Sequence, residues 1–411
     1  MASPDAKSIP ARQRILAVLP IGCGKRWGYW YRDLGLVVRT LREQGHDAWL
    51  VLLPSSEGPP EKDEPVIIAS REELESPAWW KAQAPEGVIL NLWGALRWER
   101  IRESAREATP RLLEKLDTAG IYSPAIWWWG YFYVGYWGLR EAGSFPPVAA
   151  LKSLIRTCAL WLGPGLLDKK RAQCLARMPV LAAESPLAVE RTKRYLRAFA
   201  ERGTEVVCVP HPVDDRSLAG VMGVPKENKV ISVGRWQTYQ KNFPLLMETL
   251  GKFLGIHPGW SAEIFGQLPA DAEARLTALP AEIASRILLA GTRPNEELAR
   301  HYAAARIFLM SSRHESFNIA AAEALCSGCS VVGPPDIASV HFFTGRRSGS
   351  ASSCYSPGAL LDALCAEAEA WRAGERDARA ISSEWTALVG AQAVTARLLE
   401  LVMSGGQKTL E

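Results

Sequence analysis

Short apolar runs alternate with amphipathic stretches through the first half of the chain. The runs are short and nearly continuous in apolar residues, which is typical of strands buried on both faces of a parallel sheet. They cover residues 14–19, 47–53, 66–70, 88–92, 180–185 and 206–209. Between the first two runs, residues 30–44 carry Leu34, Val37, Val38 and Leu41 at helical spacing. The pattern predicts a doubly wound α/β domain, with a further helix at residues 110–119.

A second series of apolar runs follows, at residues 230–233, 262–265, 287–290, 307–310 and 330–332. Helical segments separate them, so we expect a second parallel sheet with covering helices. A last helix is expected over about 383–402. The segment from Pro210 to Asp214 precedes the second series and marks a domain boundary. The predicted division is a domain at 1–212, a linker at 213–224, a domain at 225–382 and a C-terminal helical segment at 383–411.

Composition narrows the class of protein. The 411 residues are enough for two domains, and 48% apolar with 22% charged residues is typical of a globular chain. A net charge of +4 argues against a dedicated nucleic-acid binder. The polar N-terminus lacks the apolar core of a signal peptide, and no apolar run approaches the ~20 residues that span a bilayer. Eight scattered cysteines suit a reducing compartment, so we expect a cytoplasmic protein.

The stretch from Ser311 to Gly333 combines strand, polar turn, helix and strand, and it carries two carboxylates. Asn318 is a good N-cap residue, so the first N–H groups of the helix face the turn that holds Glu315. A helix start of this kind favours a phosphate, and Glu315 can then hold sugar hydroxyls while Glu323 accepts hydrogen bonds from a ribose. The alternative is that Glu315 is a surface charge and Glu323 an ordinary helix charge.

A second polar cluster follows the strand at residues 230–233. Gly234 allows a sharp turn, and Arg235 and Lys241 come shortly after it. A guanidinium and an ammonium group at the carboxyl end of a parallel strand can bind a diphosphate. The alternative is two surface cations. Cys326 and Cys329 lack further ligands nearby, so we expect them to pack in the core rather than to bind a metal.

These motifs together resemble the retaining nucleotide-sugar glycosyltransferases of family 4. The resemblance rests on Glu315-x7-Glu323 in its frame, on Gly234-Arg235 with Lys241, and on the Gly45-His46-Asp47 turn. It implies the GT-B fold, an α/β architecture of two Rossmann-like domains whose parallel sheets face each other across a cleft. It also implies that the C-terminal segment packs back toward the first domain.

The resemblance further implies a reaction and a site. A sugar would move from a nucleotide-diphosphate sugar to an acceptor hydroxyl with retention, and the leaving phosphate would take the acceptor proton. The implied catalytic residues are Glu315, Arg235 and Lys241. The implied donor-binding residues are Gly234, Thr292, Phe317, Asn318, Ile319 and Glu323. We expect Gly22 and Gly24 to join them, because their loop follows the first strand at its carboxyl end, where ligands bind in such sheets; the alternative is an ordinary tight turn. No Asp-x-Asp motif is present, so we expect no metal and no cofactor beyond the donor substrate.

Acceptor binding is less determined. Residues 126–139 are crowded with aromatic side chains, and basic residues follow from Lys152 to Arg177. The aromatic stretch can form core between the domains, an acceptor surface that includes Trp128, Trp129 and Tyr131, or a patch that contacts the inner membrane surface. Many relatives use a first-domain histidine near the reacting sugar, but before the segment from Pro210 to Asp214 this chain has only His46.

Two other functions fit the same fold. One is a nucleotide-binding protein that has lost transfer activity, and the other is a sugar-nucleotide epimerase. Arg235, Lys241, Glu315 and Glu323 argue against the first. The second would need a carboxylate and histidine arrangement that the sequence does not show. The nucleobase, the sugar and the acceptor stay open.

Overall fold

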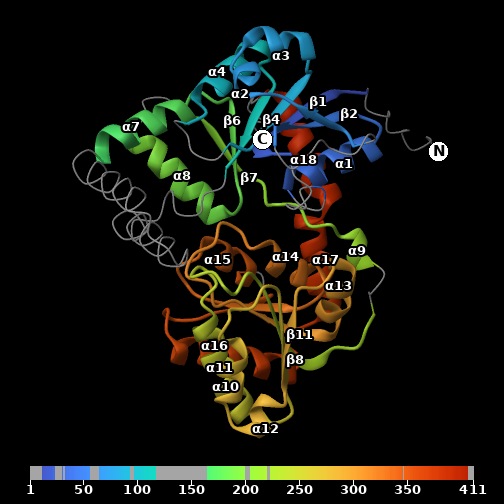
Figure 1. Cartoon of the computed structure of the whole chain (residues 1–411), viewed down its shortest axis with the longest axis vertical. Helices are drawn as coiled ribbons and strands as arrows, with labels where there is room; N and C mark the ends of the chain where they lie inside the picture. Colours follow the sequence, from blue (N-terminus) through green and yellow to red (C-terminus); the bar gives the residue numbers. More distant parts are fainter. Residues whose placement is uncertain are drawn as a thin grey trace, which may run out of the picture.

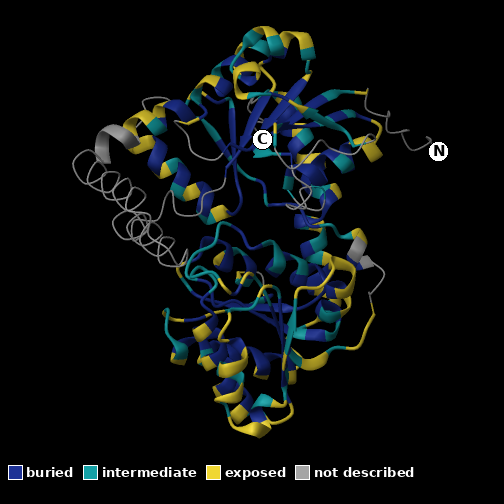
Figure 2. Ribbon diagram, viewed as in Figure 1, coloured by how far each residue is buried: buried dark blue, intermediate teal, exposed yellow. Residues whose placement is uncertain are grey.

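The structure is a computed structural model that describes residues 12–23, 30, 33–55, 64–92, 97–116, 164–199, 204–219, 223–345 and 347–405. Two parallel sheets with flanking helices lie one above the other along the long axis of the molecule (Figure 1). Buried residues concentrate in the strands and on the inner faces of the helices (Figure 2). The predicted α/β class with two parallel sheets is confirmed.

The first sheet has seven described strands in the order β3-β2-β1-β4-β5-β6-β7, all parallel. Ile15 of β1 lies between Ala48 of β2 and Gly87 of β4, so the strand order changes direction at β1. The strands are β1 (Arg14–Gly22), β2 (Asp47–Leu53), β3 (Val66–Ile68), β4 (Gly87–Leu90), β5 (Leu112–Lys115), β6 (Val180–Ala183) and β7 (Glu205–Cys208).

Helices cover both faces of this sheet. One face packs against α1 (Asp33–Glu43) and against α18 (Ala391–Ser404), which comes from the far end of the chain. The other face packs against α2 (Arg71–Leu74), α3 (Pro77–Gln83), α4 (Glu99–Ala108), α7 (Pro164–Leu175) and α8 (Pro186–Phe199). Two separate cores result, as a doubly wound sheet requires.

The prediction of a helix at residues 110–119 is wrong, because the strand β5 lies within this segment. Leu112 and Leu113 point into the two opposite cores of the sheet. The charged residues that suggested a solvent-facing helix surface are buried and paired. Glu114 receives two hydrogen bonds from Arg102 of α4, at 2.7 and 2.5 Å. Only the tertiary contacts make a short strand with two buried charges stable.

The second sheet has six described strands in the order β10-β9-β8-β11-β12-β13, again all parallel. The strands are β8 (Glu227–Val233), β9 (Ser261–Phe265), β10 (Ile287–Gly291), β11 (Ala305–Leu309), β12 (Ser330–Gly333) and β13 (Gly349–Ala351). The helices are α9 (Arg216–Ala219), α10 (Phe243–Ile256), α11 (Ala272–Thr277), α12 (Ala281–Ala284), α13 (Asn295–Ala304), α14 (Ile319–Cys326), α15 (Ala338–Thr344), α16 (Pro357–Arg372) and α17 (Ala378–Val389).

The helix expected over about 383–402 is two helices that meet at Gly390. Trp385 of α17 is fully buried against Phe342 and Phe343 of the second domain. A Cβ on Gly390 would lie 2.5 Å from the Thr386 carbonyl oxygen, so the chain turns where only glycine fits. Beyond it, α18 packs on the first sheet. The Val213 N–H donates to the Val389 carbonyl at 2.8 Å, so the chain lies side by side where it crosses between the domains near Val213 and near Gly390.

Candidate donor site

Two loops meet at the carboxyl edge of the second sheet. One follows β8 and the other follows β11, and these two strands are neighbours. The Ser311 hydroxyl donates to the Lys241 carbonyl at 2.8 Å, and the Arg313 N–H donates to the Gln240 carbonyl at 2.8 Å. The strand order and these two hydrogen bonds therefore bring together the two motifs that are about seventy residues apart in the sequence.

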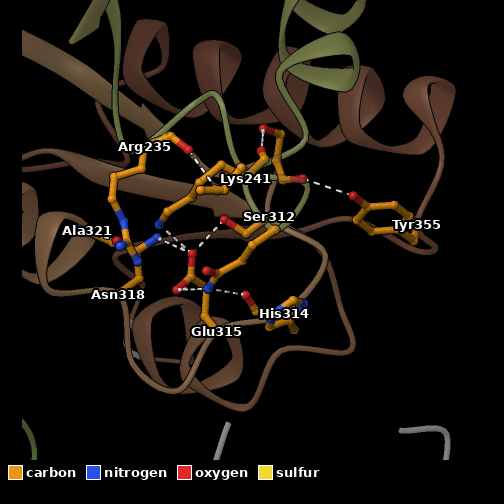
Figure 3. Close-up of polar contacts among 11 residues, drawn as sticks. Arg235, Lys241, Ser312, His314, Glu315, Asn318, Ala321 and Tyr355 are labelled. Atoms are coloured by element: carbon orange, nitrogen blue, oxygen red, sulfur yellow. Dashed lines mark hydrogen bonds and ion pairs between the residues drawn. The ribbon is translucent and has the colours of Figure 1, made fainter. Parts of the chain in front are cut away.

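Lys241 and Glu315 form an ion pair at the centre of the two loops. The Lys241 ammonium lies 2.5 Å from Glu315 Oε1, and both side chains are largely buried. The Ser312 hydroxyl donates to the same oxygen at 2.6 Å, and the Gln240 amide donates to Oε2 at 3.1 Å. Figure 3 shows this group with Glu315 at its centre. Sequence reasoning did not single out Gln240 or Ser312, which fix the orientation of the carboxylate.

The start of α14 borders this ion pair. Asn318 adopts a left-handed backbone conformation (φ 72°), and its side chain accepts a hydrogen bond from the Ala321 N–H at 3.2 Å. Its amide group also lies 3.4 Å from Glu315 Oε1. The positive end of the helix and its first N–H groups thus lie next to Glu315, which suits an anionic group.

Arg235 lies on the same side of the site as Lys241 and the start of α14. Its side chain is exposed, and Figure 3 shows it running alongside Lys241 toward Asn318. Gly234 comes just before it, and a Cβ there would lie 3.3 Å from Lys241 Cδ. The missing side chain lets the lysine stem cross the turn. The loop therefore presents two cations next to one helix N-terminus, a combination that can bind a diphosphate.

Glu323 lies on the second turn of α14 and is partly exposed. The hydroxyl of Tyr302 from α13 donates to its Oε2 at 3.1 Å. Burial first, and then the neighbouring Glu323 carboxylate, raise the pKa of Tyr302, so this hydroxyl stays protonated as a donor. The tyrosine orients a carboxylate that can accept hydrogen bonds from a ribose.

The other predicted donor residues lie around this core. Phe317 is buried just before Asn318, and Ile319 opens α14 and is partly buried. Thr292 is exposed after β10, and Gly22 ends β1 in the first domain. Gly24, Trp128, Trp129 and Tyr131 lie outside the described residues, so their expected roles stay predictions.

A polar cluster in the first domain was missed by sequence reasoning. His211 Nδ1 lies 3.2 Å from Asp33 Oδ1, and the Lys115 ammonium lies 3.4 Å from the same oxygen. In the predicted division His211 falls in the boundary segment from Pro210 to Asp214, at the end of the first domain, and Lys115 falls in a helix. No spacing signal links these positions, because the sheet alone brings them together. His46, by contrast, lies in the turn between α1 and β2 and accepts a hydrogen bond from the Gln13 N–H.

The described residues contain neither a metal-binding set of side chains nor a membrane-spanning helix. No three histidine, cysteine or acidic side chains gather there as a set that could hold a metal ion. Within the same described part, no helix is long and apolar enough to cross a membrane. Cys326 and Cys329 are both buried in the core of the second domain.

Comparison with known proteins identifies the family of the second domain. Residues 227–365, which include both loops and α14, match the family model "Glycosyl transferases group 1". The second domain is a glycosyltransferase group 1 domain. The predicted resemblance to nucleotide-sugar glycosyltransferases is confirmed at this level, while membership of family 4 stays a prediction. A search of curated proteins found no match.

Solved structures extend the similarity to the whole chain. The pneumococcal O-GlcNAc transferase GtfA, in complex with UDP and GlcNAc, aligns with a TM-score of 0.64 at 11% identity over 96% of this chain and 100% of that one. The alpha,alpha-trehalose-phosphate synthase of Burkholderia vietnamiensis has a TM-score of 0.64 at 12% identity, covering 96% and 98%. Anabaena Alr3699/HepE with UDP-glucose has a TM-score of 0.59 at 13% identity, covering 96% and 100%. The glycosyltransferase therefore has the GT-B fold.

Proposed function

We propose that this glycosyltransferase moves a sugar from a nucleotide-diphosphate sugar to an acceptor hydroxyl, with retention at the anomeric carbon and without a metal ion. One observation carries the proposal. Lys241 and Asn318 at the N-terminus of α14 contact one carboxylate, Glu315, at the carboxyl ends of β8 and β11, and Arg235 runs alongside Lys241 (Figure 3). This is the edge of an open α/β sheet where ligands bind.

The cations and the helix N-terminus of this site can stabilise a diphosphate as it leaves the sugar. Negative charge builds on the phosphate oxygens as the bond to the anomeric carbon breaks. Lys241, Arg235 and the N–H groups at the start of α14 can stabilise this charge, because they lie together at one edge of the second sheet. A divalent ion is then not required to neutralise the leaving group.

Lys241 has a second role in this scheme. A bound diphosphate competes with Glu315 for the lysine ammonium, because both are anions within reach of it. As Lys241 turns to the phosphate, Glu315 Oε1 becomes available to the hydroxyls of the donor sugar. Ser312 and Gln240 hold the carboxylate in place during this exchange.

The chemical step needs no separate protein base. The acceptor oxygen bonds to the anomeric carbon on the face that the phosphate leaves, and the acceptor proton passes to the departing phosphate oxygen. One C–O bond forms and one breaks, and because both lie on the same face of the sugar, the anomeric configuration is retained.

The first experiment is thermal stabilisation of the purified chain by UDP, GDP and ADP and by their glucose conjugates, with EDTA present. A ligand that binds only the folded state raises the melting temperature. Stabilisation by one nucleotide supports the site, and the anomeric configuration of the product, read by NMR, tests retention. Binding without turnover would favour the nucleotide-binding protein. Inversion of configuration at one carbon of the nucleotide-bound sugar, without an acceptor, would favour the epimerase.

For the acceptor, we propose a large or apolar molecule at the cytoplasmic membrane surface, on the strength of the aromatic segment at residues 126–139. Lys169 and Lys170 on α7, which follows that segment, are exposed and can contact anionic lipid. Co-sedimentation with vesicles of phosphatidylglycerol, compared with phosphatidylcholine vesicles, tests this contact. Equal binding to both kinds of vesicle, or binding to neither, would contradict it.

A further inference from the structure

The cluster around His211 lies where the two domains meet. His211 follows β7, Lys115 ends β5, and Asp33 lies at the start of α1, after β1. All three are at the carboxyl edge of the first sheet. The His211 ring also contacts the Phe317 ring of the second domain, with 5.5 Å between the ring centroids. Because Phe317 precedes the N-cap Asn318, His211 lies beside the candidate donor site.

The two ring nitrogens of His211 differ in their hydrogen bonding, and Nδ1 is the one that pairs with Asp33. Burial alone would raise the pKa of Asp33, but the adjoining His211 and Lys115 groups lower it well below its usual range, so Asp33 is an ionised acceptor. An ionised carboxylate can only accept hydrogen bonds, and therefore His211 Nδ1 carries the proton that it donates to Oδ1. Asp33 fixes the ring and its tautomer.

The other ring nitrogen is left without a partner. His211 is 6% exposed, and within the described ranges its Nε2 has no hydrogen-bond partner. A buried polar atom in this state costs the folded protein about 1–3 kcal/mol. Such an atom calls for an explanation, and a ligand that completes the hydrogen bond supplies one.

We infer that His211 Nε2 hydrogen-bonds a hydroxyl group of a sugar substrate, and that Asp33 positions the imidazole for this contact. The inference rests on the proposed function. A hydroxyl can donate to neutral Nε2 or accept from its protonated form, whereas a phosphate oxygen suits only the protonated form. The hydroxyl can belong to the donor sugar or to the acceptor, since the ring lies between the donor site and the first domain.

Two variants separate this role from a structural one. In His211→Asn the amide lies near the position of Nδ1, so the bond to Asp33 survives and the outer contact is lost. In His211→Gln the longer side chain brings its amide near the position of Nε2. We expect His211→Asn to reduce activity by about tenfold or more, the value of one lost hydrogen bond, and His211→Gln to retain more activity.

The measurements use UDP-glucose and UDP, or the GDP or ADP equivalents if thermal stabilisation selects those. Dissociation constants for both ligands give the affinity that the sugar adds, and release of nucleotide from the donor gives turnover. Loss of the added affinity in His211→Asn assigns the hydroxyl to the donor sugar. Loss of turnover with affinity retained places the contact in the transfer step rather than in donor binding. Both outcomes support the inference.

Other outcomes overturn it. If wild type is active and His211→Asn matches it in both measurements, or if His211→Gln is the weaker variant, the role of His211 is structural and the proposed function stands. If wild type neither binds nor cleaves any donor, the proposed function fails, and the inference fails with it.

A further measurement needs no variant and applies if His211→Asn does not fold. Wild-type chain with ¹⁵N-labelled histidine has six imidazole side chains to follow by NMR. We expect one Nε2 signal to move on addition of UDP-glucose, or of UDP followed by glucose at high concentration, and not with UDP alone. No such movement for any of the six would overturn the inference.

Discussion

Among single residues, Lys241 and Glu315 hold the polar network of the site together. Their 2.5 Å contact is supported by hydrogen bonds to the carboxylate from Ser312 and Gln240. The sequence pointed to the two charges, because each follows a predicted strand. It did not indicate that they pair with each other, since this depends on β8 and β11 being neighbours.

Replacement of Lys241 tests its role on the leaving group. We expect Lys241→Ala to lower turnover more than about tenfold, because one cation on the developing phosphate charge is lost. The measurement is the rate of nucleotide release at saturating donor. Lys252→Ala is the matched control, since Lys252 is an exposed lysine on α10 that pairs with Glu248. Turnover equal to that of the control would contradict the assignment.

Glu323 is expected to act on donor affinity. We predict that Glu323→Ala weakens binding of the nucleotide diphosphate about tenfold, because a carboxylate that accepts from a ribose is removed. Calorimetry with the nucleotide alone measures this without the sugar. Glu297→Ala, an exposed carboxylate on α13, serves as control. An unchanged dissociation constant for Glu323→Ala would remove this residue from the proposed site.

At the scale of elements, strand ends decide where the site forms. β8, β9 and β11 bring three loops to one edge of the second sheet, and the tight approach of two of them depends on Gly266. Gly266 follows β9 with φ +107°, and a Cβ there would lie 1.9 Å from the Gly234 carbonyl oxygen. The Trp236 N–H donates to the Gln267 carbonyl at 2.7 Å, so this contact holds the Arg235 loop against β9.

The substitution Gly266→Ala therefore acts on both stability and donor binding. A positive φ is unfavourable for alanine, and the Cβ overlaps backbone that cannot move easily, so we expect a loss of about 2–4 kcal/mol in the free energy of unfolding. Chemical denaturation measures it. The control is Gly259→Ala, where a Cβ meets nothing within 4 Å. Similar stability of the two variants would show that the Gly234–Gly266 contact is unimportant.

At the scale of the whole molecule, the described part of the chain crosses between the domains near Val213 and at Gly390. The second crossing carries α18 onto the first sheet, where Val394, Leu398, Leu401 and Val402 complete a core with α1. α8 of the first domain also packs against α15 of the second. The first domain is therefore completed by the last helix of the chain.

A charge in α18 tests this arrangement. We expect Leu398→Asp to destabilise the first domain by about 3–5 kcal/mol, because an unpaired carboxylate replaces a fully buried leucine. Hydrogen exchange should accelerate in β1, β4 and β5 before it does in β8 and β11. Ala396→Asp changes an exposed position on the same helix and is the control. Faster exchange confined to the second sheet would refute this placement of α18.

The sequence by itself determined the features that repeat along the chain or depend on neighbouring residues. Alternating apolar runs predicted two parallel sheets, because a strand buried on both faces must be apolar almost throughout. The N-cap at Asn318 and the turn at Gly234 predicted where a helix and two cations would meet an anion. Local backbone preferences are enough for such elements.

The tertiary structure decided what depends on contacts between distant residues. β5 is a strand because Arg102 of a separate helix neutralises Glu114. The C-terminal segment divides at Gly390 because its halves pack in different domains. His211 joins Asp33 and Lys115 only because the ends of three strands lie on one edge. Buried charges and long-range pairs leave no periodic trace in a sequence, since their stability comes from partners that the chain brings together only when it folds.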